Sequence, residues 1–421
     1  MAVIRLVVVG GGIIGLCTAH FARRLGAEVT VVESATCGAG CSYGNAGWIC
    51  PGDSAPLPAP GVVGTALRSL LDPDAPLHLH PTPAWEYLSW LARFWRRCNR
   101  RDQLLGMAAL GALNRRTLTL YDELAAEGIG FEMHRTGLLH AHLDAAAASR
   151  ALERDRSLAP DGYRMPDRVV TGSEVRELEP ALGPAVAAAY LVEEERHVRP
   201  DTVTRALATG LVRAGALLVE HTPARGAVIR AGRLVAITTD RGPVDCDRAV
   251  VAVGAQTARW LRPLRVRLPM LAGKGYSFTV PLARAPQRAI DLVDTRIACS
   301  PMSCGVRLAG TMEIGRVGPG PEARRIAAMI LGSRRFLADW PVDFDAQAAL
   351  RRDAWAGLRP MTADGLPVLD AVPKASGLYV ATGHAMEGMI LGPASGEAMA
   401  EFAVTGRRPQ VLWPFSLERF I

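Results

Sequence analysis

The sequence predicts an α/β chain (α+β overall) in which a Rossmann-like nucleotide-binding domain is interleaved with a second, mostly antiparallel domain. The first observation behind this prediction is a strand, a glycine-rich turn, a helix and a second strand within residues 3–33. The second is a renewed alternation of strands and helices from about residue 168, and the third is β-like alternation at 274–280 and 307–314. Because patterns of the first domain occur at both ends of the chain, no single cut point separates the domains.

The composition is that of a large globular protein. The 421 residues are 49% apolar, 21% charged and 6% aromatic, which allows a sizeable core and excludes a disordered or fibrous chain. Scattered arginines account for the formal charge of +7, which favours anionic ligands or surfaces, and we expect no nucleic-acid partner. The eight cysteines are sparse and form no CxxC pair, so we expect reduced thiols and no metal site.

The first elements form a complete βαβ pattern. Residues 3–9 (VIRLVVV) predict a buried parallel strand, residues 16–25 a helix, and residues 28–32 a second strand. The uncharged run near the N-terminus is interrupted by glycines, and no stretch of ~20 apolar residues follows, so we expect a chain that does not span a membrane.

Between the first strand and the helix lies a glycine-rich turn whose residues are Gly10-Gly11-Gly12-Ile13-Ile14-Gly15. Gly10 permits the tight turn, Gly12 lets the backbone approach a pyrophosphate at the helix N-terminus, and Gly15 allows the helix to lie close to the strand. Glu33, at the tip of the second strand, is placed to accept both hydroxyls of an adenosine ribose and argues against NADP. The pattern predicts a dinucleotide site without separating NAD from FAD.

A second run of small and polar residues, Cys41-Ser42-Tyr43-Gly44-Asn45-Ala46-Gly47-Trp48, follows this unit. Here the sequence resembles the FAD-dependent D-amino acid oxidase superfamily, and within it the bacterial D-amino acid dehydrogenases and glycine oxidases. The resemblance implies contacts with the FAD diphosphate and isoalloxazine for Ser42, Asn45, Ala46 and Gly47. Taken without the family, the same residues fit an ordinary loop equally well.

The segment from Pro51 to about Leu124 combines a proline-rich stretch with helical patterning. Three of the chain's eight tryptophans fall between Trp85 and Trp95, and several arginines follow up to Arg101. Such a helix could lie on an anionic membrane surface. The alternative, which we favour, is a substrate-domain helix whose aromatic side chains fill a core while its arginines face solvent.

Alternating elements return in the middle of the chain. We expect a helix at 199–214 and strands at 217–220, 227–229, 234–238 and 249–253. The family resemblance implies a backbone contact to adenine near Ala224 and a return of the chain to the nucleotide near Gly254; a glycine that merely ends a strand is the alternative for Gly254.

The expected domains are discontinuous. We assign residues 1–60, 168–260 and 352–421 to the FAD-binding domain, and residues 61–167 and 261–351 to the substrate-binding domain. The second assignment rests on the β-like alternation noted above and on the aromatic helix.

The run Trp355 to Pro367 contains Gly-Leu-Arg-Pro. It resembles the family motif in which the arginine binds the substrate carboxylate, and so implies that role for Arg359. A guanidinium suits the task because it grips a carboxylate with two parallel hydrogen bonds. The alternative is an arginine that holds a local carboxylate such as Asp364.

A strand, a Gly-His turn and a helix occupy 378–403. This region resembles the closing motif of the family, which lays backbone amides and a helix N-terminus against the flavin pyrimidine. The residues that inherit this role are Gly383, His384, Glu387, Gly388 and Met389. We do not assign His384 a catalytic role, because a lone histidine in a turn is more often structural.

Three further residues complete the candidate site. Met386 stands where glycine oxidases carry a second arginine, which weakens a glycine oxidase assignment and marks Met386 as a substrate contact. Lys274 and Tyr276 match a region where relatives place polar groups over the flavin, so both are candidate catalytic residues and Tyr276 a candidate substrate contact. Both could equally face solvent from a sheet.

The resemblance implies an oxidoreductase with noncovalent FAD that oxidises the carbon–nitrogen bond of an amino acid, with D stereochemistry, by hydride transfer to flavin N5. The imino acid formed is hydrolysed to a 2-oxo acid, and a quinone or oxygen takes the electrons. A secondary amino acid (sarcosine or a hydroxyproline isomer) or glycine stays open as the substrate. Two other classes stay open as well: a flavin subunit of a membrane-peripheral electron-transfer complex, and a nucleotide-binding protein without redox chemistry. We expect a cytoplasmic enzyme, free or peripheral on the inner face of the cytoplasmic membrane.

Overall fold

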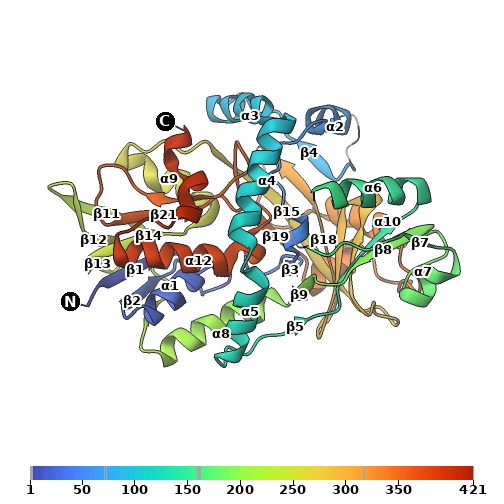
Figure 1. Ribbon diagram of the computed structural model, residues 1–421, viewed down its shortest axis with the longest axis horizontal. Helices are drawn as coiled ribbons and strands as arrows, with labels where there is room; N and C mark the ends of the chain where they lie inside the picture. Colours follow the sequence, from blue (N-terminus) through green and yellow to red (C-terminus); the bar gives the residue numbers. More distant parts are fainter. Residues whose placement is uncertain (1–2, 71, 73, 159–162, 316–317, 421) are drawn as a thin grey trace.

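The computed structural model describes residues 3–70, 72, 74–158, 163–315 and 318–420. Figure 1 shows two lobes: one carries a parallel sheet with the two chain termini, and the other a large mixed sheet. A column of two helices, α4 and α5, runs between them. The expected combination of a Rossmann-like α/β unit with an interleaved, mostly antiparallel unit is therefore confirmed.

The first lobe is built on a six-stranded sheet whose order is β10-β2-β1-β14-β21-β20. The first five strands are parallel, and β20 is antiparallel to β21. The strands span Leu217–Val219 (β10), Glu28–Val32 (β2), Arg5–Val9 (β1), Arg248–Val251 (β14), Leu378–Thr382 (β21) and Val368–Ala371 (β20). The sheet therefore joins segments from both ends and the middle of the sequence.

Both faces of this sheet are covered, which explains why its strands are almost continuously apolar. Leu6 and Val8 of β1 face one core with helices α1 (Ile13–Arg24), α8 (Pro200–Arg213) and α12 (Gly388–Thr405). Val7 and Val9 face a second core with α9 (Thr257–Leu261) and an antiparallel sheet. That three-stranded sheet comprises β11 (Ala224–Arg230), β12 (Arg233–Thr239) and β13 (Gly242–Asp245).

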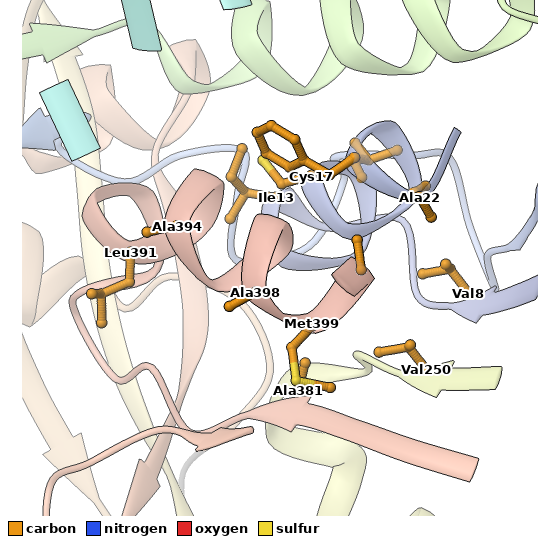
Figure 2. Close-up of a cluster of buried hydrophobic side chains, with 14 of the residues drawn as sticks. Val8, Ile13, Cys17, Ala22, Val250, Ala381, Leu391, Ala394, Ala398 and Met399 are labelled. Atoms are coloured by element: carbon orange, nitrogen blue, oxygen red, sulfur yellow. The ribbon is translucent and has the colours of Figure 1, made fainter. Parts of the chain in front are cut away.

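Helices α1 and α12 approach each other closely beneath the sheet, as Figure 2 shows for Ile13, Cys17, Ala394 and Ala398. The contact depends on small residues of α12. A Cβ atom on Gly396 would lie 2.5 Å from the Cβ of Cys17 and 2.7 Å from its carbonyl carbon. The two backbones are thus too close for a side chain at this position.

We expect Gly396→Ala to lower the free energy of unfolding by about 1–3 kcal/mol, because the added methyl group meets backbone that cannot rotate away. Gly210→Ala in α8 is the matched control, since its Cβ would find Ile129 at an ordinary 3.7 Å. The control should gain up to about 1 kcal/mol from better helix propensity. Urea unfolding followed by circular dichroism measures both, and a gain in both variants would contradict the close approach.

The second lobe contains a nine-stranded sheet with the order β19-β15-β18-β17-β16-β6-β8-β7, and β4 pairs with β18 off this path. Its strands span Trp355–Thr362 (β19), Met270–Val280 (β15), Gly305–Ile314 (β18), Ile297–Met302 (β17), Ala289–Leu292 (β16), Leu138–His142 (β6), Ala188–Val192 (β8), Val170–Thr171 (β7) and Leu77–Leu79 (β4). Helices α10 (Ala323–Arg334), α11 (Ala346–Arg352) and α7 (Ser173–Leu178) cover one face around a separate core.

The remaining elements lie around and between the two large sheets. A small sheet joins β3 (Trp48–Ile49), β9 (Arg196–Val198) and β5 (Met133–His134). Helices α4 (Arg100–Asn114) and α5 (Thr117–Ala126) share the core of the first lobe. The other helices are α2 (Val62–Ser69), α3 (Trp85–Arg97) and α6 (Ala145–Leu158), and the 3-10 turns are η1 (Pro51–Asp53), η2 (Gly254–Gln256), η3 (Arg262–Leu264), η4 (Val293–Thr295), η5 (Gln410–Phe415) and η6 (Leu417–Phe420).

Strand pairing divides the chain differently from the expected ranges at three points. β7 and β8 lie in the segment assigned to FAD binding, but they pair in the nine-stranded sheet. β19 does the same through its long pairing with β15. Conversely, α4 and α5 lie in the segment assigned to substrate binding and share the first lobe's core. These partnerships are long-range, and local sequence patterns do not encode them.

Helix α3 presents two different faces. Tyr87 and Trp90 are buried, and the indole N–H of Trp90 donates to the carbonyl of Met361 at 3.0 Å. Trp85 and Trp95 are 78% and 69% exposed. The favoured expectation of a core helix therefore holds for one face only. Among the described residues, no helix combines the length and apolarity needed to cross a bilayer.

Candidate active site

The glycine-rich turn lies at the carboxyl end of β1, where α1 begins. Gly10 has a φ of 110°, and a Cβ there would lie 2.5 Å from the carbonyl oxygen of Ala252. A Cβ on Gly15 would lie 1.9 Å from the carbonyl oxygen of Gly10. Gly12 is the extended N-cap residue of α1 and has no side chain over the helix end. The turn itself thus places no side chain over the N-terminus of α1, the end of a helix that favours an anion.

Glu33 is held beside this turn. Its Oε2 accepts a hydrogen bond from the Gly11 amide at 2.7 Å, and its Oε1 accepts one from the Ala35 amide at 2.9 Å. The carboxylate is thus oriented by backbone donors at the edge where β1 and β2 both end. This arrangement fits the acid that holds the ribose of an adenine dinucleotide.

The loop between β2 and β3 returns to the N-terminus of α1. The Ser42 hydroxyl accepts a hydrogen bond from the Ile13 amide at 3.0 Å. The Asn45 side chain shapes the loop by accepting from the Gly47 amide at 2.9 Å, and the Ala46 carbonyl accepts from the Ser300 hydroxyl at 2.8 Å. The loop is therefore tied to both lobes, and Ser42 stands at the helix end where a diphosphate would bind.

Two predicted nucleotide contacts lie farther along the chain. Gly254 follows β14 with a φ of 54°, and its carbonyl accepts from the Thr382 hydroxyl at 3.0 Å. It therefore lies at the same sheet edge as Gly10, because β14 pairs directly with β1. Ala224 begins β11 on the other side of the sheet, where its carbonyl accepts from the indole of Trp260 at 3.2 Å.

Arg359 lies on β19 opposite Gly273 of β15. Its guanidinium passes over Gly275, where a Cβ would lie 2.4 Å from Nη2, and Nη1 reaches the Thr311 carbonyl at 3.5 Å. Throughout the described residues, no carboxylate lies within ion-pair distance of it, and burial lowers the pKa of Arg359.

Asp364, the alternative partner of this arginine, instead binds Arg419, with Nε 2.6 Å from Oδ2. A permanently charged guanidinium that is half-buried without a carboxylate is costly unless an anion joins it. Arg359 therefore has the character of an anion-binding group.

The Gly-His turn runs beside the strand that carries Arg359. Met361 and His384 form an isolated bridge, and the Ala385 amide donates to the Pro360 carbonyl at 3.0 Å. From the other side, the Cys41 thiol donates to the Leu358 carbonyl at 2.5 Å. Three sequence motifs thus converge: the 41–48 loop, the arginine strand and the turn before α12.

Within this turn the residues have different surroundings. Burial lowers the pKa of His384 to about 3, and its Nε2 lies 3.0 Å from the Ser395 hydroxyl, so it is a neutral structural group. Gly388 is the first residue of α12, and the Met389 carbonyl accepts from the Tyr121 hydroxyl at 2.7 Å. Met386 is 52% exposed.

Residues 5–402 match the model of the DAO family, described as FAD dependent oxidoreductase. The chain belongs to this family. It is 31% identical over 414 residues to a D-amino acid dehydrogenase of Paramagnetospirillum magneticum, covering 96% of this chain and 95% of the relative. A D-amino acid dehydrogenase of Allorhizobium ampelinum is 28% identical, with 97% and 96% covered.

Solved structures share the fold of this DAO family chain. Glycine oxidase from Geobacillus kaustophilus superposes with a TM-score of 0.75 at 22% identity and covers 100% of both chains. L-proline dehydrogenase from P. horikoshii has a TM-score of 0.71 at 20% identity, covering 99% of this chain and 98% of that one.

FAD is the cofactor of this family, and the geometry described above fits it. The N-terminus of α1, the glycines that leave room for backbone approach, and Glu33 at the end of β2 lie at one sheet edge, as the cradle of a dinucleotide requires. The converging motifs around Arg359 provide the second region, where the ring and its substrate would meet.

The structure does not bring Lys274 and Tyr276 to Arg359. Lys274 Nζ lies 3.4 Å from Glu322 beside α10, and the Tyr276 hydroxyl donates to Glu313. Successive residues of a strand point to opposite faces of the sheet. The neighbours of Lys274 and Tyr276 on β15, Gly275 and Ser277, therefore face the first lobe. Gly275 lies under Arg359, and the Ser277 hydroxyl donates to the Gly44 carbonyl.

Sequence reasoning missed two residues that contact the Arg359 guanidinium, Gly275 and Thr311. It also missed three residues that contact the 41–48 loop, Ser277, Ser300 and Trp355. A Cβ on Gly44 or Gly357 would lie 2.4 or 2.1 Å from the ring of Trp355, so this indole fills space that two glycines leave. The repeated glycines around Lys274 were the available signal, since glycine inside a strand often marks a close approach.

Proposed function

We propose that this chain oxidises the carbon–nitrogen bond of an amino acid, a D-amino acid, with Arg359 as the anchor of the substrate carboxylate. The single observation that carries the proposal is the half-buried guanidinium of Arg359 without a carboxylate partner among the described residues. The names of the relatives, D-amino acid dehydrogenases at about 30% identity, support the substrate class and stereochemistry.

The chemistry divides between cofactor and protein. Bound FAD would supply the electron-accepting ring for the hydride that leaves the substrate α-carbon, and water would hydrolyse the imino acid product to a 2-oxo acid. Arg359 fixes the carboxylate by two parallel hydrogen bonds and so orients the α-hydrogen. Neutral His384 is engaged with Ser395, which supports a mechanism without a histidine base.

The same proposal covers which amino acid is oxidised and which electron acceptor, a quinone or oxygen, is used. Met386 offers no second cation for the carboxylate, which favours an amino acid held by one arginine over glycine. Purified flavoprotein should be assayed with a panel of D- and L-amino acids, sarcosine, glycine and hydroxyproline isomers, first with a quinone and then with oxygen alone. We expect the highest kcat/KM for a D-amino acid with the quinone; turnover of none of the panel would overturn the proposal.

We expect Gly275→Ala to raise KM for the best substrate about tenfold with little change in kcat. The new methyl group would lie 2.4 Å from Nη2 of Arg359, and a flexible guanidinium can yield at a cost of about 1–2 kcal/mol. Gly226→Ala in β11 is the control, because its Cβ meets Thr238 at 3.5 Å. Steady-state kinetics separate the two, and an unchanged KM in Gly275→Ala would mean that Arg359 does not bind substrate from this position.

We also propose that the enzyme attaches peripherally to an anionic membrane through the segment Trp85–Arg101. Trp85, Leu88 and Trp95 are 78%, 50% and 69% exposed and recur at helical spacing on one side of α3. Next to them, Arg93, Arg96 and Arg97 line a cavity of about 270 Å³ that Arg419 shares. Exposed tryptophans beside arginines suit the interface of an anionic bilayer.

Vesicle flotation tests this attachment. The wild-type protein should float with phosphatidylglycerol vesicles at low salt and be released at high salt. Replacing Trp85, Leu88 and Trp95 together by serine should reduce binding at least tenfold. Leu331→Ser, at an exposed leucine of α10, is the control. Equal binding of both variants, or binding only to neutral vesicles, would exclude this surface.

A further inference from the structure

The turn before α12 carries a half-buried carboxyl group, that of Glu387. Its Oε2 accepts a hydrogen bond from the Ser54 hydroxyl at 2.6 Å, and Ser54 in turn accepts one from the Asn114 side chain at 2.7 Å. The chain continues to Thr117, whose hydroxyl lies 3.0 Å from Oδ1 of Asn114. Glu387 is therefore fixed at the start of α12 by the hydroxyl of Ser54, which directly follows η1, and through it by Asn114 of α4.

The charged groups near Glu387 lie on η1, which carries Asp53, and on β6, which carries His140. Asp53 acts on it directly, and no cation does so within the part of the chain that the structure describes. The nearby Cys50 thiol is neutral, because burial raises its pKa well above the usual value. On the far side of Asp53, Nε2 of His140 lies 3.8 Å from Oδ2, and the acids around it raise the pKa of His140 to about 9 against the effect of burial.

These surroundings make Glu387 titrate near neutrality. Burial, with Asp53 adding to it, raises the pKa of Glu387 to about 7, although the Ser54 hydrogen bond lowers it. Both forms of the side chain are therefore populated in the pH range in which a cytoplasmic enzyme works. The family resemblance of this segment implies that the flavin pyrimidine lies at the beginning of the same helix.

We propose that Glu387 takes up one proton from solvent when the flavin accepts two electrons, and releases it when the electrons leave. This inference rests on the proposed function and on the FAD placement that the closing motif implies. Reduction adds negative charge beside a carboxylate in a site of low dielectric, and the two like charges repel unless the carboxylate is neutralised. The substrate gives up a hydride to the ring; the proton on Glu387 comes from water and returns to water.

The consequence is measurable in the reduction potential of the bound flavin. One proton for two electrons adds about 30 mV per pH unit to the slope of potential against pH. Below pH about 7 Glu387 already holds its proton in the oxidised enzyme, so the added slope is absent there. Above that pH the carboxylate must be protonated on reduction, and the slope steepens. The plot should therefore bend near neutrality.

The test is a dye-coupled spectroscopic redox titration of the FAD-loaded enzyme across neutral pH. Glu387→Gln should remove the bend, since the amide keeps its place beside Ser54 but cannot take up a proton. Asp53→Asn should move the bend to lower pH, and Ser54→Ala should move it to higher pH, because these groups raise and lower the pKa of Glu387. Glu401→Gln, on an exposed position of α12, should leave the bend unchanged.

The outcomes are distinct. A straight plot for the wild-type enzyme, or a bend that persists in Glu387→Gln, would overturn the inference while leaving the proposed function intact. Protein purified without flavin would instead contradict the proposed function. If Glu387→Gln does not fold, the opposite shifts in Asp53→Asn and Ser54→Ala decide the matter, and the absence of either shift counts against Glu387.

Discussion

Replacing Arg359 by alanine should lower kcat/KM for the best amino acid by about 10²–10³-fold while FAD stays bound. The variant loses two charge-assisted hydrogen bonds to the substrate carboxylate, together worth about 3–4 kcal/mol. The fold should tolerate the change. The guanidinium has no carboxylate partner among the described residues, so its removal leaves no carboxylate there without its counter-charge. Stopped-flow reduction of the flavin by substrate measures the loss.

Two comparisons make this prediction specific. Arg359→Lys keeps the charge but loses the planar pair of donors, so its activity should fall between those of the wild type and Arg359→Ala. The amine that corresponds to the amino acid without its carboxylate should react equally poorly with the wild type and the alanine variant. Turnover of the amino acid within a few fold of wild type in Arg359→Ala would remove the residue from the active site.

Gly15→Ala should yield protein without flavin. The new Cβ would lie 1.9 Å from the carbonyl oxygen of Gly10, and backbone on both sides of the contact leaves no rotamer to escape the clash. The turn would have to open, at a cost of about 3 kcal/mol or more, which corresponds to a loss of FAD affinity of about a hundredfold or more. The ratio of flavin to protein absorbance after purification measures the effect.

A control variant lies in the neighbouring loop. Gly40→Ala meets no atom within 4 Å, so it should retain flavin and thermal stability like the wild type. Full flavin occupancy in Gly15→Ala would show that the turn is not the diphosphate cradle. Loss of flavin in both variants would point to general sensitivity of this region and not to the contact with Gly10.

The elements of the first lobe were predictable because their causes are local. The strand at Glu28–Val32 has the expected bounds, and the helix expected at 199–214 spans Pro200–Arg213. Apolar runs, helical periodicity and the steric freedom of glycine at Gly10 act within a few residues. The aromatic helix was predicted as an element, but its two faces were not, since burial of Trp90 depends on Met361, far along the chain.

The sequence by itself determined the family-like motifs: the glycine turn with Glu33, the arginine in Gly-Leu-Arg-Pro and the Gly-His turn. Tertiary structure alone decided which of these residues meet. Arg359 faces Gly275 and the turn at Ala385, whereas Lys274 and Tyr276 face α10, Glu322 and Glu313. The physical reason is that a strand alternates its faces with a period of two residues, and the face that meets the cofactor is set by long-range strand pairing and by the docking of the two lobes.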